Sequence, residues 1–364
     1  MNKMSFFRIV SFWLIVVYSG SGVIKSFGQS RQNIMGLLTP DCSFLGKQHS
    51  GRIGYYLSEA GDVNTDGYDD FMIAAYHVSL HGWNSGAVFL FLGGEHKWGL
   101  NTSVNKADAI FRGKKAFDMV GYHVEGGGDF NGDGFDDLLI GAPGNWERRS
   151  GFPGKAYIVF GGNNPQWSRD FILEDHADVA FVGETDFDQF GYAVAFAGDL
   201  NNDGCDDILC GAAFRTELNE WSGKVYLIFG RRSVDQREMA AVDVSAATFI
   251  YDSDKGKLGS SVAGVGDVNQ DGFPDFMMGA PGIGTSFLLF GNAELNWGQN
   301  FDLSHADCIF TPEFALDDAG WQIKPAGDVN NDGYPDILIS GLEIEYEKGK
   351  AYVIFGKKNW NQSV

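Results

Sequence analysis

Residues 129–137 read DFNGDGFDD, a stretch with four aspartates, one asparagine and two glycines. Related stretches are DVNTDGYDD (62–70), DLNNDGCDD (199–207), DVNQDGFPD (267–275) and DVNNDGYPD (328–336). In all five copies, positions 1, 3 and 5 are Asp, Asn and Asp, position 6 is Gly and position 9 is Asp. Oxygens at alternate positions of a curling loop can point inward together, and Ca²⁺ takes six to eight oxygens at about 2.3–2.6 Å. Because Gly at position 6 permits a sharp turn with positive φ, each stretch predicts a calcium loop.

The predicted ligands are the side chains at positions 1, 3, 5 and 9 and the backbone carbonyl at position 7, with water completing the shell. In chain order they are Asp62, Asn64, Asp66, Tyr68, Asp70; Asp129, Asn131, Asp133, Phe135, Asp137; Asp199, Asn201, Asp203, Cys205, Asp207; Asp267, Asn269, Asp271, Phe273, Asp275; and Asp328, Asn330, Asp332, Tyr334 and Asp336. We therefore expect about five Ca²⁺ ions, one for each loop.

The remaining loop positions follow from this assignment. Position 7 varies from Tyr to Phe to Cys, as expected of a residue that gives only its carbonyl, and its side chain is expected to anchor in the core. Position 8 is Asp in three loops and Pro in the other two. Because proline is accepted there, the side chain at position 8 is expected to lie outside the ligand shell, and Asp136 is expected to face solvent.

Three other interpretations of the loops are weaker. An EF-hand needs Glu at position 12 and flanking helices, but position 12 is Ile73, Ile140, Cys210, Met278 or Ile339, and the flanks have the pattern of strands. Mg²⁺ prefers a tight octahedron with several waters. A solvated acidic turn could arise once by chance, but five copies in phase argue against it.

The loops belong to a longer repeat, since their first aspartates recur at intervals of 61 to 70 residues. A Gly-led stretch precedes each loop, an apolar run follows it, and two further short runs come before the next repeat in all but the last copy. These runs are too short for helices and are bounded by glycine, so they predict strands. Four strands per repeat predict an all-β fold, a β-propeller.

The repeats span about 47–113, 114–183, 184–252, 253–312 and 313–360. The last repeat has no fourth apolar run before Val364, whereas residues 33–46 resemble 300–312, with Cys42 in the register of Cys308. We therefore expect residues 33–46 to supply the missing strand and close a ring of five four-stranded blades, which forms a single domain over 29–364. The alternative is an open ring completed by another chain.

The first 28 residues have the order of a secretory signal peptide. Lys3 and Arg8 precede the apolar run at 9–18, which is too short to span a membrane, and small residues follow. No transmembrane anchor is expected, so the expected location is secreted or at the cell surface. The net charge of −21 argues against nucleic acid as a partner.

The four cysteines predict no disulfide framework, because Cys205 and Cys210 are too far apart on one strand to bridge.

The segments FGYAVAFAGDLNNDGCDDILCGAAF and VGYHVEGGGDFNGDGFDDLLIGAPG resemble FG-GAP repeats, the units of the integrin alpha-subunit head. The resemblance covers roughly residues 34–357. It implies a propeller whose loops bind calcium and a surface role in adhesion. The integrin head has seven repeats, whereas this chain has five, and the stalk and cytoplasmic tail of an integrin are not recognisable. Related repeats also occur in fungal lectins.

The sequence predicts a binding protein rather than an enzyme, because its histidines and carboxylates form no recognisable catalytic pattern. The face opposite the calcium loops carries the variable connections between second and third strands, where Trp and Arg favour binding. The candidate ligand-binding residues are Trp83, Trp146, Arg148, Arg149, Arg215 and Trp221. The expected ligand is an extracellular protein, with a carbohydrate ligand, as in a lectin, as the alternative. Trp98, Trp167, Trp297 and Trp360 recur in phase and are expected to pack between blades.

Overall fold

The computed structural model describes residues 40–46, 51–95, 97–144, 152–214, 221–253, 255–295, 297–311, 318–342 and 349–360. Short strands dominate because each apolar run is rich in β-branched and aromatic residues and ends at a glycine turn. The second and third strands of the second repeat, Asp137–Ala142 and Lys155–Val159, are buried at every position. Burial on both faces explains why these runs lack polar alternation.

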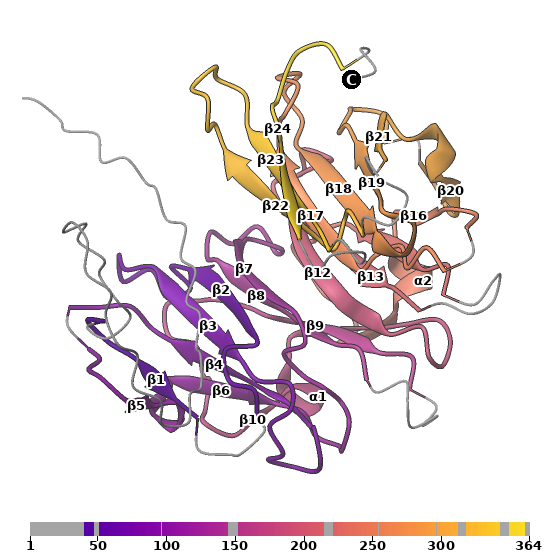
Figure 1. Cartoon of the computed structure of the whole chain (residues 1–364). Coiled ribbons are helices and arrows are strands. Elements are labelled where there is room, and N and C mark those ends of the chain that lie inside the picture. Colours follow the sequence, from indigo (N-terminus) through magenta and orange to yellow (C-terminus); the bar gives the residue numbers. More distant parts are fainter. Residues whose placement is uncertain are drawn as a thin grey trace, which may run out of the picture.

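The elements are short and follow one another in a regular order (Figure 1). The strands are β1 (Phe44–Leu45), β2 (Tyr56–Gly61), β3 (Asp70–Ala74), β4 (Ala87–Phe91), β5 (Thr102–Ser103), β6 (Ala109–Arg112), β7 (Val124–Gly128), β8 (Asp137–Ala142), β9 (Lys155–Val159), β10 (Phe171–Ile172), β11 (Val179–Val182), β12 (Phe190–Gly198), β13 (Asp207–Ala212), β14 (Lys224–Ile228), β15 (Glu238–Ala240), β16 (Ala247–Ile250), β17 (Ser261–Gly266), β18 (Asp275–Ala280), β19 (Thr285–Leu289), β20 (Phe301–Asp302), β21 (Cys308–Phe310), β22 (Gln322–Gly327), β23 (Asp336–Gly341) and β24 (Lys350–Ile354). The helical turns are η1 (Val104–Lys106), α1 (Leu173–His176), α2 (Ala241–Val244), η3 (Pro281–Ile283) and η4 (Leu303–His305).

Each repeat forms one antiparallel sheet, or blade. The first four blades have the strand orders β2-β3-β4-β6, β7-β8-β9-β11, β12-β13-β14-β16 and β17-β18-β19-β21, and the fifth has β22-β23-β24. A short strand from the following repeat adds to the outer strand in parallel, namely β10 to β6, β15 to β11 and β20 to β16. Figure 1 shows the blades following one another from the indigo first blade to the yellow fifth. The predicted all-β propeller of FG-GAP-like repeats is confirmed.

Most of the core lies between blades, and one further buried cluster belongs to the first blade alone. One buried cluster joins the first and second blades, and similar clusters join the second to the third, the third to the fourth and the fourth to the fifth. Trp167, Trp297 and Trp360 each pack against one of these clusters, and Trp98 packs against the cluster of the first blade. The predicted packing between blades is confirmed for Trp167, Trp297 and Trp360, whereas Trp98 packs on the first blade beside Phe44. The four cysteines are free thiols.

The amino-terminal part of the described chain lies against the first blade. β1 pairs in parallel with β5, with Phe44 opposite Thr102. Among the described residues, β24 pairs with β23 alone, so the expected pairing of residues 33–46 with the fifth blade is not observed there and stays a prediction. Residues 33–39 and the expected signal peptide lie outside the described residues.

In the described ranges, none of the helices has the length and apolar character needed to span a bilayer.

Candidate functional site

The aspartate loops connect the first and second strands of each blade and are organised by their own backbone amides. In the first loop, the N–H of Asp66 donates to Asp62 Oδ1 and Asn64 Oδ1, both at 3.0 Å. The N–H of Gly67 donates to Asp62 Oδ2 at 2.9 Å, and that of Tyr68 to Asp66 Oδ1 at 3.0 Å. Because one N–H binds oxygens of positions 1 and 3 together, these oxygens converge on the same turn.

The other four loops repeat these contacts. The same four bonds occur in 129–137, 199–207, 267–275 and 328–336, at 2.7–3.0 Å. The glycine at position 6 has φ between 85° and 97° in every loop, a conformation that favours glycine. The common sequence therefore produces one loop conformation five times.

The aspartate at position 9 begins the second strand and is buried. In the second loop, Asp137 Oδ2 accepts the N–H of Phe130 and Oδ1 accepts the N–H of Gly161, both at 2.9 Å. The carboxylate thereby ties the loop to the end of the third strand. Burial raises the pKa of this aspartate, to about 8 at Asp137, about 8 at Asp275, about 7 at Asp207 and about 6 at Asp70, although the backbone N–H groups oppose the rise. A cation beside it would favour its ionised form.

The donor set can be compared with what a cation requires. In the described part of the chain, no three His, Cys, Asp or Glu side chains gather closely enough to hold a metal ion by themselves. Each loop, however, also offers an amide oxygen and a backbone carbonyl, and a carboxylate oxygen that accepts one N–H keeps a second lone pair. Hard carboxylate, amide and carbonyl oxygens are the donors that Ca²⁺ prefers. The donor types fit calcium, and binding itself stays a prediction.

Position 8 has a role that sequence reasoning missed. Asp136 Oδ2 accepts the N–H of Asp62 at 2.8 Å, and Asp206 Oδ2 accepts the N–H of Asp129 at 2.9 Å. The expectation that Asp136 faces solvent is therefore wrong, because the loop of the preceding blade lies within its reach. Where position 8 is proline, Pro274 lies in the equivalent place, close to Gly198 of the preceding blade. Position 8 is thus a contact between neighbouring blades.

Position 7 is also less buried than expected. Cys205 is 2% exposed, but Tyr68 is 44% exposed and the other three side chains are half-buried. The expectation of a core anchor holds for Cys205 alone. The Cβ atoms of Tyr68 and its equivalents lie against a glycine that follows the third strand, such as Gly93.

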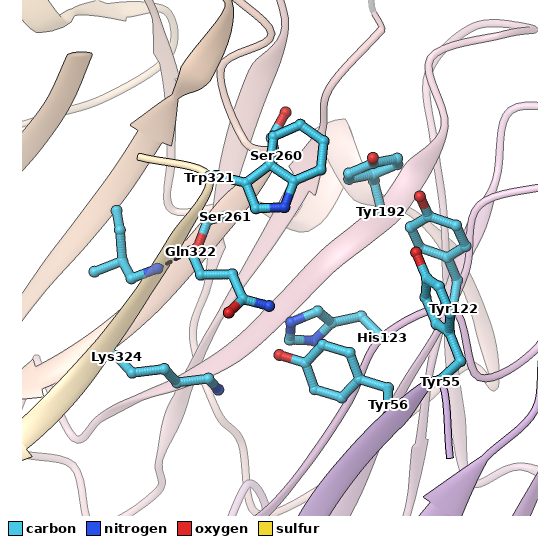
Figure 2. Close-up of a pocket in the computed structure, with 11 residues that line it drawn as sticks. Tyr55, Tyr56, Tyr122, His123, Tyr192, Ser260, Ser261, Trp321, Gln322 and Lys324 are labelled. Atoms are coloured by element: carbon cyan, nitrogen blue, oxygen red, sulfur yellow. Dashed lines mark hydrogen bonds between the residues drawn. The ribbon is translucent and has the colours of Figure 1, made fainter. Parts of the chain in front are cut away.

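A pocket opens at the other end of the propeller axis (Figure 2). It is lined by Tyr55, Tyr56, Tyr122, His123, Tyr192, Ser260, Ser261, Trp321, Gln322, Ile323 and Lys324. These residues lie at or beside the beginning of the first strand of each of the five blades. Because each first strand leads to an aspartate loop at its far end, the pocket and the loops lie on opposite faces.

Aromatic rings form a continuous band from this pocket across the face. The ring centroid of Tyr122 lies 5.7 Å from Tyr55 and 4.7 Å from Tyr192. Phe214 continues the band at 5.5 Å from Tyr192, and Trp221 lies 6.0 Å beyond it. Burial raises the pKa of Tyr122 and of Tyr192, so their hydroxyl groups stay neutral. Lys257 Nζ lies over the outer end of the band, 5.9 Å from the centre of the Phe214 ring and 5.7 Å from that of Trp221.

Charged side chains lie on one side of the pocket. Lys324 Nζ donates to Glu125 Oε2 at 3.1 Å and lies 5.9 Å from the centre of the Tyr56 ring. Burial lowers the pKa of Lys324, but Glu125 and Tyr56 beside it raise it more, so the ammonium stays charged. Burial lowers the pKa of His123 well below its usual value, and among the described residues its Nδ1 has no hydrogen-bond partner. His123 is therefore neutral.

The predicted ligand-binding residues divide into two groups. Trp83 is 69% exposed and Trp221 is 37% exposed and belongs to the aromatic band. Trp146, Arg148, Arg149 and Arg215 lie outside the described residues. The pocket itself was missed, although its signal was present: an aromatic residue directly follows the glycine that leads the first strand at Tyr55, Tyr122, Tyr192 and Trp321.

Comparisons with known proteins agree with this architecture. A family model described as FG-GAP repeat matches residues 120–159, 190–228 and 258–287, in the second, third and fourth blades. Integrin alpha-3 of Cricetulus griseus is 28% identical over 225 residues, which is 61% of this chain and 19% of that protein. Integrin alpha-5 of Xenopus laevis is 29% identical over 259 residues, 68% of this chain and 23% of that protein. Integrin alpha-3 of Mus musculus is 31% identical over 155 residues, 42% of this chain and 14% of that protein.

The chain therefore spans less than a quarter of the length of these relatives. Within that span, the repeats, the strand order and the aspartate loops recur blade by blade. This chain is an all-β propeller that contains FG-GAP repeats in its second, third and fourth blades and is similar to integrin alpha subunits.

Proposed function

We propose that this protein is an adhesion or binding module for a protein partner outside the cell and that the axial pocket is its contact site. The observation that carries the proposal is the meeting of Tyr55, Tyr122, Tyr192 and Trp321, from four blades, around one pocket. Rigid aromatic side chains supply large contact area at low entropic cost, and they are enriched at binding hot spots. The similarity to integrin alpha subunits supports a role in adhesion at the cell surface.

The chemistry of the pocket favours a cationic or aromatic side chain of the partner. The faces of Tyr and Trp rings attract cations, and the chain carries a net charge of −21, which raises the local concentration of positive groups. Lys324 lies 5.9 Å from the centre of the Tyr56 ring, and its charge is balanced by Glu125 at 3.1 Å. A basic side chain inserted between Tyr122 and Trp321 fits these surroundings.

We also propose that Ca²⁺ braces the five aspartate loops. The side chains at positions 1, 3, 5 and 9 and the carbonyl at position 7 would hold the ion, which would supply the positive charge that these carboxylates otherwise lack. The role is structural, because the loops lie on the face opposite the pocket. Secretion through the predicted signal peptide is part of the same proposal and would place the protein where calcium is abundant.

The pocket can be tested with short peptides. We expect Trp321 fluorescence to respond to a blocked Gly-Arg-Gly peptide and less to the matched Gly-Gln-Gly peptide, and the response to weaken at least tenfold in Tyr122→Ala. Val242→Ala, an exposed change on the outer edge of the third blade, is the matched control. Equal responses to the two peptides, or no effect of Tyr122→Ala, would refute the pocket assignment. A glycan array on the same protein examines the carbohydrate alternative.

A further inference from the structure

The axial pocket is lined by one equivalent strand position in all five blades. In each blade this position follows a glycine with φ between 76° and 91°, so the same backbone turn leads into the pocket every time. The five residues are Tyr55, Tyr122, Tyr192, Ser260 and Trp321. Four of the five are aromatic, so a ligand in the pocket meets rings from four blades.

Part of this aromatic surface is open to a ligand. Tyr55 is 45% exposed and Trp321 is 42% exposed, although both line the pocket. Figure 2 shows Tyr122 and Tyr192, whose ring centroids are 4.7 Å apart, across the pocket from Trp321. The faces of Tyr and Trp rings attract a cation that lies within about 6 Å of the ring centroid. The aromatic wall therefore suits a positively charged group.

The pocket offers such a cation no carboxylate. Among the described residues that line it, none is Asp or Glu, and the acceptors present are neutral hydroxyl and amide oxygens. Glu125 beside the pocket already accepts a hydrogen bond from Lys324 at 3.1 Å. A lysine ammonium has three N–H donors and an arginine guanidinium has five, and each donor that is left unpaired on burial costs free energy. A quaternary ammonium has no N–H group, so the lining favours it over a lysine or arginine side chain.

Hydrogen-bonding groups lie on the other side of the pocket. Figure 2 shows Lys324 apart from Trp321 and Tyr192, and Gln322 and His123 lie between them in this view. The Nδ1 atom of His123 is buried and, within the described part of the chain, has no hydrogen-bond partner. The ammonium of Lys324 donates hydrogen bonds, and an oxygen atom of a ligand can accept one of them. The pocket therefore suits a ligand with a quaternary ammonium at one end and an oxygen at the other.

The size of the cavity limits the ligand to a small group. Its volume is about 240 Å³, whereas pockets for drug-sized molecules measure roughly 300–1,000 Å³. Such a cavity holds a headgroup of several heavy atoms rather than a folded segment of a partner. The net charge of −21 adds a field that attracts cations from solution.

We propose that the axial pocket binds choline, either free or as the terminal group of a larger molecule. The trimethylammonium group lies between Tyr122 and Trp321, and the choline oxygen accepts a hydrogen bond from Lys324. Choline joins its quaternary nitrogen to its oxygen through two carbons, which suits a cavity of this size. This inference rests on the proposed contact site and names the chemical group that occupies it.

Isothermal titration calorimetry with choline tests the aromatic wall. The matched neutral ligand is 3,3-dimethyl-1-butanol, in which a carbon atom replaces the quaternary nitrogen and the shape is unchanged. Ethanolamine is the matched cation that has N–H donors. We expect choline to bind about tenfold more tightly than either. Equal affinity for choline and dimethylbutanol would overturn the attraction between the cation and the rings. Equal or tighter binding of ethanolamine would overturn the preference for a quaternary ammonium.

Variants and a shorter ligand assign the two ends of choline. Trp321 is 42% exposed, so its replacement leaves the core intact. Trp321→Leu should weaken choline binding about tenfold, whereas Trp321→Tyr keeps a ring and should bind nearly as the wild type does. Val242→Ala is the control at an exposed site of the third blade. Equal losses in both Trp321 variants would contradict the role of the ring. Tetramethylammonium lacks the oxygen and should bind more weakly than choline, and equal affinity would overturn the contact with Lys324.

Two further measurements identify the carrier of the choline and separate this inference from the proposed contact site. Binding to phosphatidylcholine vesicles, but not to phosphatidylglycerol vesicles, would place the choline on a lipid surface, and binding to soluble phosphocholine alone would place it on a soluble molecule. No binding of choline with an intact response to the Gly-Arg-Gly peptide would overturn this inference and leave the contact site standing. No response to either ligand would overturn both.

Discussion

Substitution of Gly61 by alanine measures how tightly the blades are joined at the aspartate loops. Gly61 is the last residue of β2 and has φ of 75°. A Cβ atom there would lie 2.1, 2.5 and 2.8 Å from Oδ2, Cγ and Cβ of Asp136. Because the Cβ of Asp136 is among these atoms, rotation of its side chain does not relieve the overlap. Gly266 is the matched control, since its φ is 74° and its Cβ would meet Pro335 only at an ordinary contact of 3.5 Å.

The two variants share one cost and differ in another. Both place a non-glycine residue in a left-handed conformation, at roughly 1–2 kcal/mol. Gly61→Ala also displaces Asp136 and breaks its 2.8 Å bond from the N–H of Asp62, and a hydrogen bond to a charged group is worth about 1.5–3 kcal/mol. We therefore expect Gly61→Ala to lower the free energy of unfolding by about 3–5 kcal/mol and Gly266→Ala by about 1–2 kcal/mol.

Urea unfolding followed by circular dichroism gives both values under one condition. Asp136→Ala provides a cycle: it should cost about 1.5–3 kcal/mol alone and much less in the Gly61→Ala background, because the bond is already broken there. Equal losses for Gly61→Ala and Gly266→Ala would show that the close approach of Asp136 to Gly61 does not constrain the fold. Full additivity with Asp136→Ala would contradict the broken bond as the cause.

Three further predictions address calcium, the pocket and pH. Calcium at 100 times its dissociation constant should stabilise the fold by about 2.7 kcal/mol for each site that binds it only when folded, and identical melting temperatures in calcium and in chelator would refute the calcium loops. Tyr122→Ala should weaken partner binding yet leave the calcium response unchanged, since pocket and loops lie on opposite faces; loss of both would indicate a folding defect. Burial raises the pKa of Asp118 to about 6 against an opposing N–H from Lys115, so the stability that it contributes is complete below about pH 3.8 and is lost as pH rises through 6. Asp118→Asn should therefore gain roughly 2 kcal/mol on the wild type between pH 4 and pH 7.5, and a difference independent of pH would refute it.

The repeats were predictable because five copies constrain one another. Asp, Asn, Asp, Gly and Asp at fixed loop positions, with glycine-bounded apolar runs on either side, indicate blades and their order without any structure. The packing role of Trp98 and its equivalents was also predictable, since a recurring tryptophan in a repeat array occupies an equivalent core position. Repetition turns a weak local pattern into a strong one.

Contacts between repeats were harder to predict. Position 8 accepts Asp or Pro, which suggested a solvent-facing residue, yet Asp136 binds the preceding loop and Pro274 packs on the preceding blade. The two residue types fill one place by different means, so variation in sequence concealed a shared role. The pocket was missed for a related reason: Tyr55, Tyr122, Tyr192 and Trp321 recur with the period of the blades and resemble strand residues until the blades bring them together.

Substitution of Gly327 tests whether the ring of blades is open or closed. Its φ of 69° matches those of Gly61 and Gly266, and a Cβ there meets nothing within 4 Å in the open arrangement. If the ring stays open in solution, Gly327→Ala should cost about 1–2 kcal/mol, as Gly266→Ala does. If the fifth blade docks on the first, Asp69 takes the place that Asp136 has beside Gly61, and Gly327→Ala should cost about 3–5 kcal/mol. Asp69→Ala then separates the causes further, because it should remove the excess cost in a closed ring and leave the smaller cost unchanged in an open one.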